Sequence, residues 1–346
     1  MFDPINKVGA FTSFDGILKH VIVGDMIDSS YFNHVDTPGI EVVKQICYES
    51  KQDLDKLANI YVSHGVTVER PAIQSKKPSI ELIAGTNVIN PAPPKTPHDH
   101  VLCIDNIFVN TFSTIERFQD KKSIQHIVDR LSNNIKYLEV PTPTFWDYDY
   151  YDQLTNELWP GNNDILCDGP CFYPCGNTVF FTQQETNSER GVNFIKDIFQ
   201  KLSFVQLNLP IKNHLDGQFR IIKPGHLISV HPKQVLVEQF PKFKSWDITQ
   251  DNSYQTNKSL FLKNLNAIKD WIDTDINNQS CDLGFVHINS NLVIINNTNK
   301  NLCKALDRAK VDWIDAQLRH SIFWNSSVSC ATAIIHREDE CIDYFN

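Results

Sequence analysis

A histidine and an aspartate two positions apart, His214 and Asp216, are the first residues whose types and spacing could do chemistry. On a β-strand, side chains two apart project from the same face, so the imidazole and the carboxylate could meet one small molecule. A His-x-Asp triplet by itself is more often a surface pair than a site. Its meaning therefore depends on the other reactive residues and on the elements that position them.

Cysteine is the other reactive residue type, and the 346-residue chain has nine of them. The odd number leaves at least one unpaired, and in a chain of this length most are expected to be buried thiols rather than a disulfide framework. Cys167, Cys171 and Cys175 are four positions apart, which raises a zinc or iron–sulfur hypothesis. No convincing fourth ligand follows, and the intervening prolines indicate a loop, so the sequence predicts no metal site.

The formal net charge of -9 limits the classes of partner. Nucleic acids and anionic membranes attract basic surfaces, so small molecules or proteins are the expected partners of this acidic chain. Residues 1–19 lack the basic start and apolar core of a signal peptide, and no apolar run approaches the roughly 18 residues of a membrane span. A cytoplasmic location is the expectation.

The periodicity of the apolar residues predicts short strands alternating with helices. Helices are predicted over residues 41–64, 118–131, 187–202, 260–272 and 302–309. Strands are predicted at residues 19–24, 66–71, 101–104, 107–109, 177–182 and 329–335, with hairpins at 219–222/226–230 and 284–288/292–295. Residues 72–97 are predicted as a loop and residues 148–159 as a surface loop or lid.

The same pattern favours a single α/β domain over residues 1–346, because no change of composition marks a linker. Short sheets are expected. A Gly-x-Gly-x-x-Gly fingerprint and a Walker loop are both absent from the sequence, which weakens a nucleotide-binding interpretation.

Six short motifs follow one another along nearly the whole chain. They are Ile22-Val-Gly24, Ser63-His-Gly-Val-Thr-Val-Glu-Arg-Pro71, Pro97-His-Asp-His100, Glu185-Thr-Asn-Ser-Glu-Arg-Gly191, His214-Leu-Asp216 and Ser329-Cys-Ala-Thr332. In this order the chain resembles the guanidino-group modifying enzymes, and most of all the arginine:glycine amidinotransferase branch, whose relatives include dimethylarginine dimethylaminohydrolase and arginine deiminase. The resemblance implies a pentein-like fold, a five-module α/β propeller with a pseudo-fivefold axis and a site at its central opening.

The resemblance also implies a catalytic site. The nucleophile falls on Cys330, the histidine on His214 and the acid that orients it on Asp168, while Asp99 and Asp216 match carboxylates that grip a guanidinium. A guanidinium carbon is a poor electrophile, so it needs a thiolate. The histidine can protonate a departing amine and then deprotonate the incoming nucleophile, and two carboxylates can fix the guanidinium plane by paired hydrogen bonds.

Several of these assignments leave alternatives open. Relatives have a second acid where this chain has Cys171, and a shifted register would put Tyr173 in place of Asp168. The first register is preferred because the glycine and strand that follow then align without a gap. Asp105 is the rival of Asp99, since it also precedes a strand.

Two further positions bear on the choice of substrate. Relatives are glycine-rich before the cysteine, whereas this chain has Asn325-Ser-Ser-Val-Ser329, small polar residues that can still form a tight turn. The basic residue that grips a substrate carboxylate in relatives falls near Lys233, one residue from register.

The leading expectation is an amidinotransferase that moves the amidino group of arginine to an amine acceptor through a covalent intermediate on Cys330, without a cofactor. A hydrolase of the deiminase or dimethylaminohydrolase type, with water as the acceptor, is the alternative enzyme. A relative that has lost turnover and acts as a binding protein is the alternative from another class, motivated by Cys171 and the missing glycines. The expected partners are arginine, the amine acceptor and a second copy in a possible homodimer.

Overall fold

A computed structural model describes most of the chain. The described residues are 14–33, 40–73, 80–83, 86–89, 95–112, 118–132, 136–141, 165–184, 186–211, 214–252, 283–321, 323–324, 326–338 and 343–345. The helix predicted over residues 260–272 and the lid predicted over residues 148–159 lie outside them.

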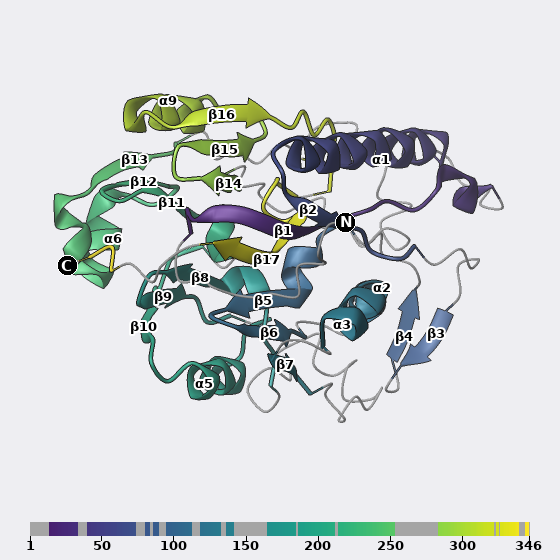
Figure 1. The fold of residues 1–346 in the computed structure, drawn as a ribbon, viewed down its shortest axis with the longest axis horizontal. Coiled ribbons are helices and arrows are strands. Elements are labelled where there is room, and N and C mark those ends of the chain that lie inside the picture. Colours follow the sequence, from purple (N-terminus) through teal and green to yellow (C-terminus); the bar gives the residue numbers. More distant parts are fainter. Residues whose placement is uncertain are drawn as a thin grey trace.

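Among these residues, the strands form five three-stranded sheets and one two-stranded sheet. Each three-stranded sheet combines an antiparallel pair of strands, which is a hairpin in four of the sheets, with a third strand that runs parallel to the middle strand. A parallel neighbour needs a crossover connection, and a helix supplies it in each module. Figure 1 shows the sheets around the centre of the molecule with the helices outside them. The predicted five-module α/β fold is confirmed.

Four modules are continuous in the sequence. The first contains β5 (Val101–Ile104), β6 (Ile107–Asn110), α2 (Phe118–Ser123), α3 (Gln125–Ser132) and β7 (Lys136–Glu139). The second contains β8 (Phe172–Cys175), β9 (Thr178–Phe181), α5 (Glu189–Ile198) and β10 (Ser203–Gln206). The third contains β11 (Phe219–Lys223), β12 (His226–Ser229), α6 (Lys233–Gln239) and β13 (Asp247–Gln250). The fourth contains β14 (Val286–Asn289), β15 (Leu292–Ile295), α9 (Lys300–Ala309) and β16 (Asp312–Asp315).

The fifth module combines both ends of the chain. It contains β17 (Thr332–Glu338), β1 (Ile17–Val23), α1 (Ile40–Ser63) and β2 (Thr67–Glu69). β1 runs antiparallel to β17 and parallel to β2. The first and last described strands therefore lie in one sheet, which closes the ring of modules.

Helix α1 illustrates how the sequence builds the outer layer. Its buried residues include Val43, Ile46, Leu54 and Leu57, a spacing that places them on one face of the helix. After α1 the chain turns at Gly65, whose φ of 76° lies in the left-handed region that glycine adopts without strain.

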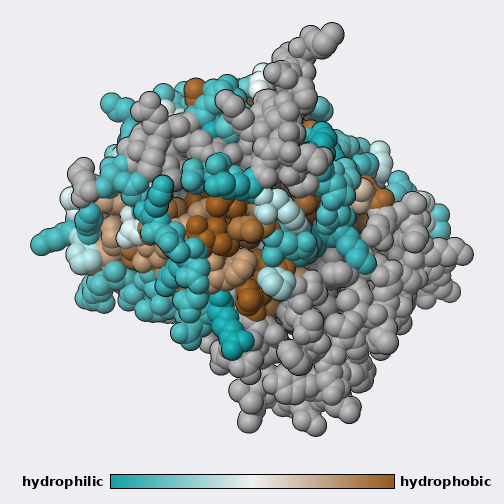
Figure 2. Space-filling model, turned by 60° about the horizontal axis from the view of Figure 1, so that its bottom comes forward, coloured by the Kyte–Doolittle hydropathy of each residue, from teal (hydrophilic) through white to brown (hydrophobic). Residues whose placement is uncertain are grey.

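The surface in Figure 2 shows a band of hydrophobic residues bordered by hydrophilic ones. Within the described part of the chain, no helix has the length and apolar character needed to cross a membrane.

Four predictions of local structure are wrong in part. Residues 72–97, predicted as a loop, contain the hairpin of β3 (Ile80–Ile83) and β4 (Thr86–Ile89), whose branched apolar residues stand between flanks rich in proline and lysine. The helix predicted over residues 118–131 is divided into α2 and α3. The final strand begins at Thr332, so Cys330 lies in the turn before it. His214 and Asp216 belong to a 3-10 turn rather than a strand.

Candidate active site

Five of the six predicted site residues lie in turns that immediately precede the first strand of a module. Their positions are Asp99 within Pro97–His100 before β5, Asp168 at the start of the Gly169–Cys171 turn before β8, His214 and Asp216 at the Leu215–Gly217 turn before β11, and Cys330 before β17. The Gly169–Cys171 turn contacts both of the other 3-10 turns, and Pro97–His100 contacts β17. Residues far apart in the sequence thus converge at one end of the modules.

Gly169 allows two of these turns to approach closely. A Cβ at this position would lie 2.3 Å from the carbonyl oxygen of His98 and 2.8 Å from that of Val101. Backbone atoms cannot swing aside as a flexible side chain can, so a larger residue would separate Asp168 from the turn that carries Asp99.

His214 and Asp168 form a hydrogen-bonded pair at the centre of this group. Nε2 of His214 lies 2.9 Å from Oδ2 of Asp168, which is buried, while His214 is part-exposed. One carboxylate oxygen of Asp99, one of Asp168 and one ring nitrogen of His214 all lie within 4.8 Å of one another. A second carboxylate therefore stands beside the imidazole and its acid.

The charges around His214 favour its imidazolium form. Burial alone would lower the pKa of His214, but the charge of Asp168 and its hydrogen bond, together with the charges of Asp99 and Asp216, raise the pKa to about 10. At neutral pH the imidazolium is the main form and can donate a proton.

Cys330 is part-exposed, whereas the other described cysteines are buried. Its Sγ lies 3.3 Å from Oγ of Ser327, which lies 3.0 Å from Oγ of Ser329. The Ser329 hydroxyl in turn donates to Oδ2 of Asp216 over 2.5 Å. Two hydroxyl groups therefore connect the thiol to a buried carboxylate.

The environment of Cys330 favours the neutral thiol. Burial, together with the negative charges of Asp216 and Asp99, raises the pKa of the thiol to about 12, while the hydrogen bonds with Ser327 act in the opposite direction. A cation bound against the two carboxylates would offset their charge and lower this pKa.

Asp216 has one oxygen available for such a cation. Its Oδ2 lies 3.8 Å from Nδ1 of His98 and 4.0 Å from Nη1 of Arg220, while its Oδ1 is buried without a hydrogen-bond partner among the described residues. Leaving a buried carboxylate oxygen unsatisfied is costly, so a ligand with N–H donors would be stabilised there. A cavity of about 90 Å³ borders Asp216 and His98 and extends past Tyr173 and Arg220.

Comparison with solved structures identifies the architecture. The inosamine-phosphate amidinotransferase of Streptomyces griseus superposes with a TM-score of 0.71 at 16% identity, over 98% of this chain and 100% of that one. An amidinotransferase of the saxitoxin biosynthetic pathway from Microseira wollei gives 0.70 at 18% identity, over 98% and 99% of the two chains. The dimethylarginine dimethylaminohydrolase of Pseudomonas aeruginosa gives 0.57 at 12% identity, over 92% and 100%.

The chain has the pentein fold. No protein-family model and no curated protein sequence matches it. The pentein assignment therefore depends on the ring of ββαβ modules and on the superposition along nearly the full length of each chain.

In this pentein fold, two residues considered from the sequence lie apart from the five grouped residues. They are Lys233, the sixth predicted site residue, and Asp105, the alternative to Asp99. Lys233 is exposed at the start of α6, and its ammonium donates to the carbonyl oxygen of Trp246. Asp105 lies in the exposed turn between β5 and β6, at the opposite end of β5 from Asp99. Its backbone, with φ of 55°, forms the hairpin turn.

Tyr173, which the alternative register would put in place of Asp168, lies in a different environment. Tyr173 is buried on β8, and its hydroxyl lies 3.3 Å from the backbone nitrogen of Ile221. Cys171 is fully buried and accepts a hydrogen bond from Gln184 over 2.9 Å. The contact with His214 is made by Asp168.

The three cysteines spaced four apart, Cys167, Cys171 and Cys175, are buried among apolar residues and do not form one group. Cys167 and Cys171 lie in one apolar cluster and Cys175 in another. Burial, with the nearby charge of Asp168, raises the pKa of Cys171 well above its usual range. In the described part of the chain, the residues close enough to share one ion are Asp99, Asp168 and His214 rather than these thiols.

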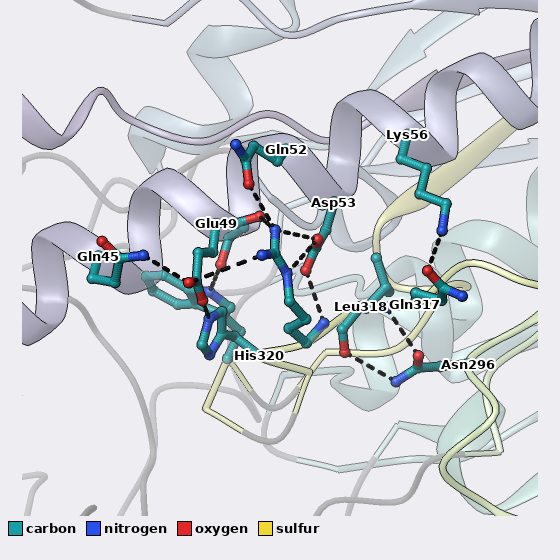
Figure 3. Close-up of polar contacts among 12 residues, drawn as sticks. Gln45, Glu49, Gln52, Asp53, Lys56, Asn296, Gln317, Leu318 and His320 are labelled. Carbon is teal, nitrogen blue, oxygen red and sulfur yellow. Dashed lines mark hydrogen bonds and ion pairs between the residues drawn. The ribbon is translucent and has the colours of Figure 1, made fainter.

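The segment that leads to Cys330 is anchored to α1, as Figure 3 shows for residues including Glu49, Asp53 and His320. The backbone N–H and the Nε of Arg319 each donate to Asp53 over 2.8 Å. Nε2 of His320 lies 2.5 Å from Oε2 of Glu49. Helix α1 therefore holds the chain a short distance before the thiol.

Three residues of the site, Ser327, Ser329 and His98, were not predicted from the sequence. His98 lies 3.1 Å from the carbonyl oxygen of Ser329 through its Nδ1. The available signal was the run of small polar residues directly before Cys330, which was interpreted only as a turn.

Proposed function

We propose that this protein is an amidinotransferase that takes the amidino group of arginine and passes it to an amine acceptor. The observation that carries the proposal is the grouping of a thiol, Cys330, with an imidazolium–carboxylate pair and two further buried carboxylates. Such a site favours a substrate that brings a planar cation to the carboxylates and an electrophilic carbon to the thiol. The fold shared with two amidinotransferases supports the choice.

In the first half of the proposed reaction, Asp99 and Asp216 bind the guanidinium of arginine. The thiolate of Cys330 forms a bond to the guanidinium carbon, and the bond from that carbon to the side-chain nitrogen of the ornithine part breaks. His214 gives its proton to the departing nitrogen, as its pKa of about 10 permits at neutral pH. Ornithine leaves, and the amidino group remains on Cys330 as a thioether.

In the second half, an amine attacks the amidino carbon. His214, now neutral, takes the proton that the amine loses, and the carbon–sulfur bond breaks to return Cys330 as a thiolate. The product is the guanidino derivative of the acceptor. Asp168 keeps the imidazole oriented through both halves, so it acts on the reaction through His214.

A hydrolase is the second candidate, because the pentein fold is shared with a dimethylarginine dimethylaminohydrolase and an arginine dihydrolase. The thioether would form in the same way, but a terminal nitrogen of the guanidinium would depart and water would be the acceptor. If His214 protonates the side-chain nitrogen of arginine, ornithine departs as in the transferase. If it protonates a terminal nitrogen, that nitrogen departs as in the hydrolase.

The deciding experiment is an incubation of the protein with arginine, with and without glycine or another amine, followed by analysis of the products. Ornithine formed beyond one equivalent per protein only when the amine is present supports the transferase, and citrulline with ammonia supports the hydrolase. Mass spectrometry of the Cys330 peptide should show an adduct of amidino mass after ornithine is lost. Cys330→Ala should abolish turnover while Cys303→Ala should not, and absence of every product and of the adduct would leave only the binding-protein interpretation.

A further inference from the structure

Ser327 and Ser329 join the thiol of Cys330 to the carboxylate of Asp216 in one hydrogen-bonded series. We propose that these two hydroxyls form a switch that ties the ionisation of Cys330 to the binding of a guanidinium at Asp216. The switch gives the serines a positioning role in the proposed function above and rests on it for the identity of the substrate.

The direction of the hydrogen bonds follows from the ionised carboxylate at one end. Asp216 can only accept, so the hydroxyl of Ser329 donates to it. The oxygen of Ser329 then accepts from Ser327, whose single proton is thereby used. Toward Sγ, the Ser327 hydroxyl can only accept while this arrangement holds, so the hydrogen bond by which this hydroxyl would lower the pKa of the thiol is withheld. The backbone N–H of Ser327 still favours the thiolate.

The surroundings keep this direction fixed. Ser327 and Ser329 are 5% and 2% exposed, and Asp216 is 2% exposed, so water has little access to the series. Gly284 leaves the room that the two hydroxyls occupy, because a Cβ there would lie 1.7 Å from Oγ of Ser327 and 2.4 Å from Oγ of Ser329. The hydrogen bonds of the pair are therefore set by the protein.

A bound guanidinium would reverse the direction of the hydrogen bonds between Asp216 and Cys330. Its N–H groups would donate to Asp216, including Oδ1, which has no hydrogen-bond partner among the residues described, and would compete with Ser329 at Oδ2. The proton of Ser327 would then be available to Sγ. The thiol proton leaves to solvent, and the resulting thiolate accepts a hydrogen bond from Ser327, so one proton is released for each guanidinium bound.

Other charged or titratable groups also face this region. They are Asp99 and His98 from the turn before β5, and His214 and Arg220 from the turn before β11 and from β11 itself. Their influence on the thiol acts through space and persists when a serine hydroxyl is removed. Serine variants therefore separate the hydrogen-bond switch from the general effect of charge.

The test is the rate at which iodoacetamide alkylates Cys330 as a function of pH, measured by mass spectrometry with and without guanidinium chloride at a non-denaturing concentration. Guanidinium should accelerate the reaction of the wild type. Ser329→Ala releases the proton of Ser327 toward sulfur, so the ligand-free rate at neutral pH should rise about tenfold. Ser327→Ala removes the donor, so the rate with guanidinium should fall about tenfold.

The critical result is that alkylation becomes faster in Ser329→Ala and slower in Ser327→Ala. A loosened structure would instead change the alkylation rates of both variants in the same direction. Ser326→Ala is the matched control and should leave both rates unchanged, while Ser327→Thr keeps a hydroxyl and should restore the response to guanidinium. Circular dichroism checks that each variant is folded. Parallel changes in the two alanine variants, or a wild-type rate that ignores guanidinium, would overturn the switch. Because alkylation needs no turnover, a lack of ornithine and citrulline would refute only the proposed function.

Discussion

At the scale of single residues, three buried carboxylates set the protonation of the candidate site. Asp99, Asp168 and Asp216 raise the pKa of His214 to about 10, and the charges of Asp99 and Asp216, added to burial, raise that of Cys330 to about 12. The free protein thus holds an acid in its active form and a nucleophile in its inactive form. A bound cation lowers both pKa values, which favours the thiolate, while His214 starts high enough to keep its proton near neutral pH.

Replacing Asp168 with asparagine should lower the pKa of His214, because the charge and the acceptor that stabilise the imidazolium are both lost. If the proposed function holds, turnover should fall by about 10² to 10⁴. Titration of the His214 ring protons by NMR measures the first effect. Asp105→Asn is the matched control at an exposed turn, and an unchanged His214 titration in Asp168→Asn would contradict the assignment.

The proposed turnover should also lose rate at alkaline pH. The folded-state pKa of His214 is raised, so in the free protein the imidazolium is present below about pH 10 and disappears above it, and a bound cation moves this loss to lower pH. Release of ornithine, which needs that proton, should then fall about tenfold for each further pH unit. A pH series of single-turnover rates measures this limb, and it should move to lower pH in Asp168→Asn.

At the scale of elements, the candidate site depends on how turns are held rather than on long strands. Cys330 follows a segment whose Arg319 and His320 bind side chains of α1. Asp53 supplies the main acceptor, is 6% exposed and meets both the backbone and the guanidinium of Arg319. The helix thus fixes the path of the chain toward the thiol.

Asp53→Asn should lower the free energy of unfolding by about 1–3 kcal/mol, because the backbone N–H and the Nε of Arg319 lose an ionised acceptor at the buried Asp53. Denaturant unfolding measures the change. Glu41→Gln removes a charge from the exposed first turn of the same helix and should cost less than about 1 kcal/mol. Equal losses in the two variants would show that Asp53 has no special anchoring role.

At the scale of the whole molecule, the ring of modules is closed by non-local pairing. β1 and β17 come from opposite ends of the described chain, yet they share a sheet and bury Ile22, which packs with Ala333 and Ile335. Since Cys330 directly precedes β17, the same closure brings the thiol to the other turns of the candidate site. Stability and site geometry are therefore coupled through this sheet.

Ile22→Ala should destabilise the protein by about 2–5 kcal/mol, since it leaves a cavity at a fully buried position of this sheet. Ile17→Ala, on the same strand but 51% exposed, should change stability by less than about 0.5 kcal/mol. Unfolding followed by circular dichroism and by tryptophan fluorescence measures both variants. Separate transitions for the two probes would show that the modules do not unfold as one unit.

Local pattern was sufficient to predict α1 and the hairpin strands of the modules except β8, because their apolar residues are buried with clear periodicity. The strand β8 was not predicted, since the prolines around its cysteines indicated a loop. The third strands β7, β10, β13 and β16 were not predicted. Each has only four residues and exposed or half-exposed positions at both ends, so its sequence carries a weak alternation signal. Their place depends on parallel pairing across a helix, which a short window of sequence does not contain.

The sequence by itself determined which reactive groups are present: a cysteine in its motif, a histidine with an aspartate two positions on, and acids before predicted strands. Only the tertiary structure decided which atoms meet. The Ser329 hydroxyl and Asp216 are 113 positions apart, and their contact exists because two modules of the ring place their first turns together. Hydrogen bonds and charge effects depend on distances of a few ångströms, and the closure of the ring sets those distances between residues that the linear chain leaves far apart.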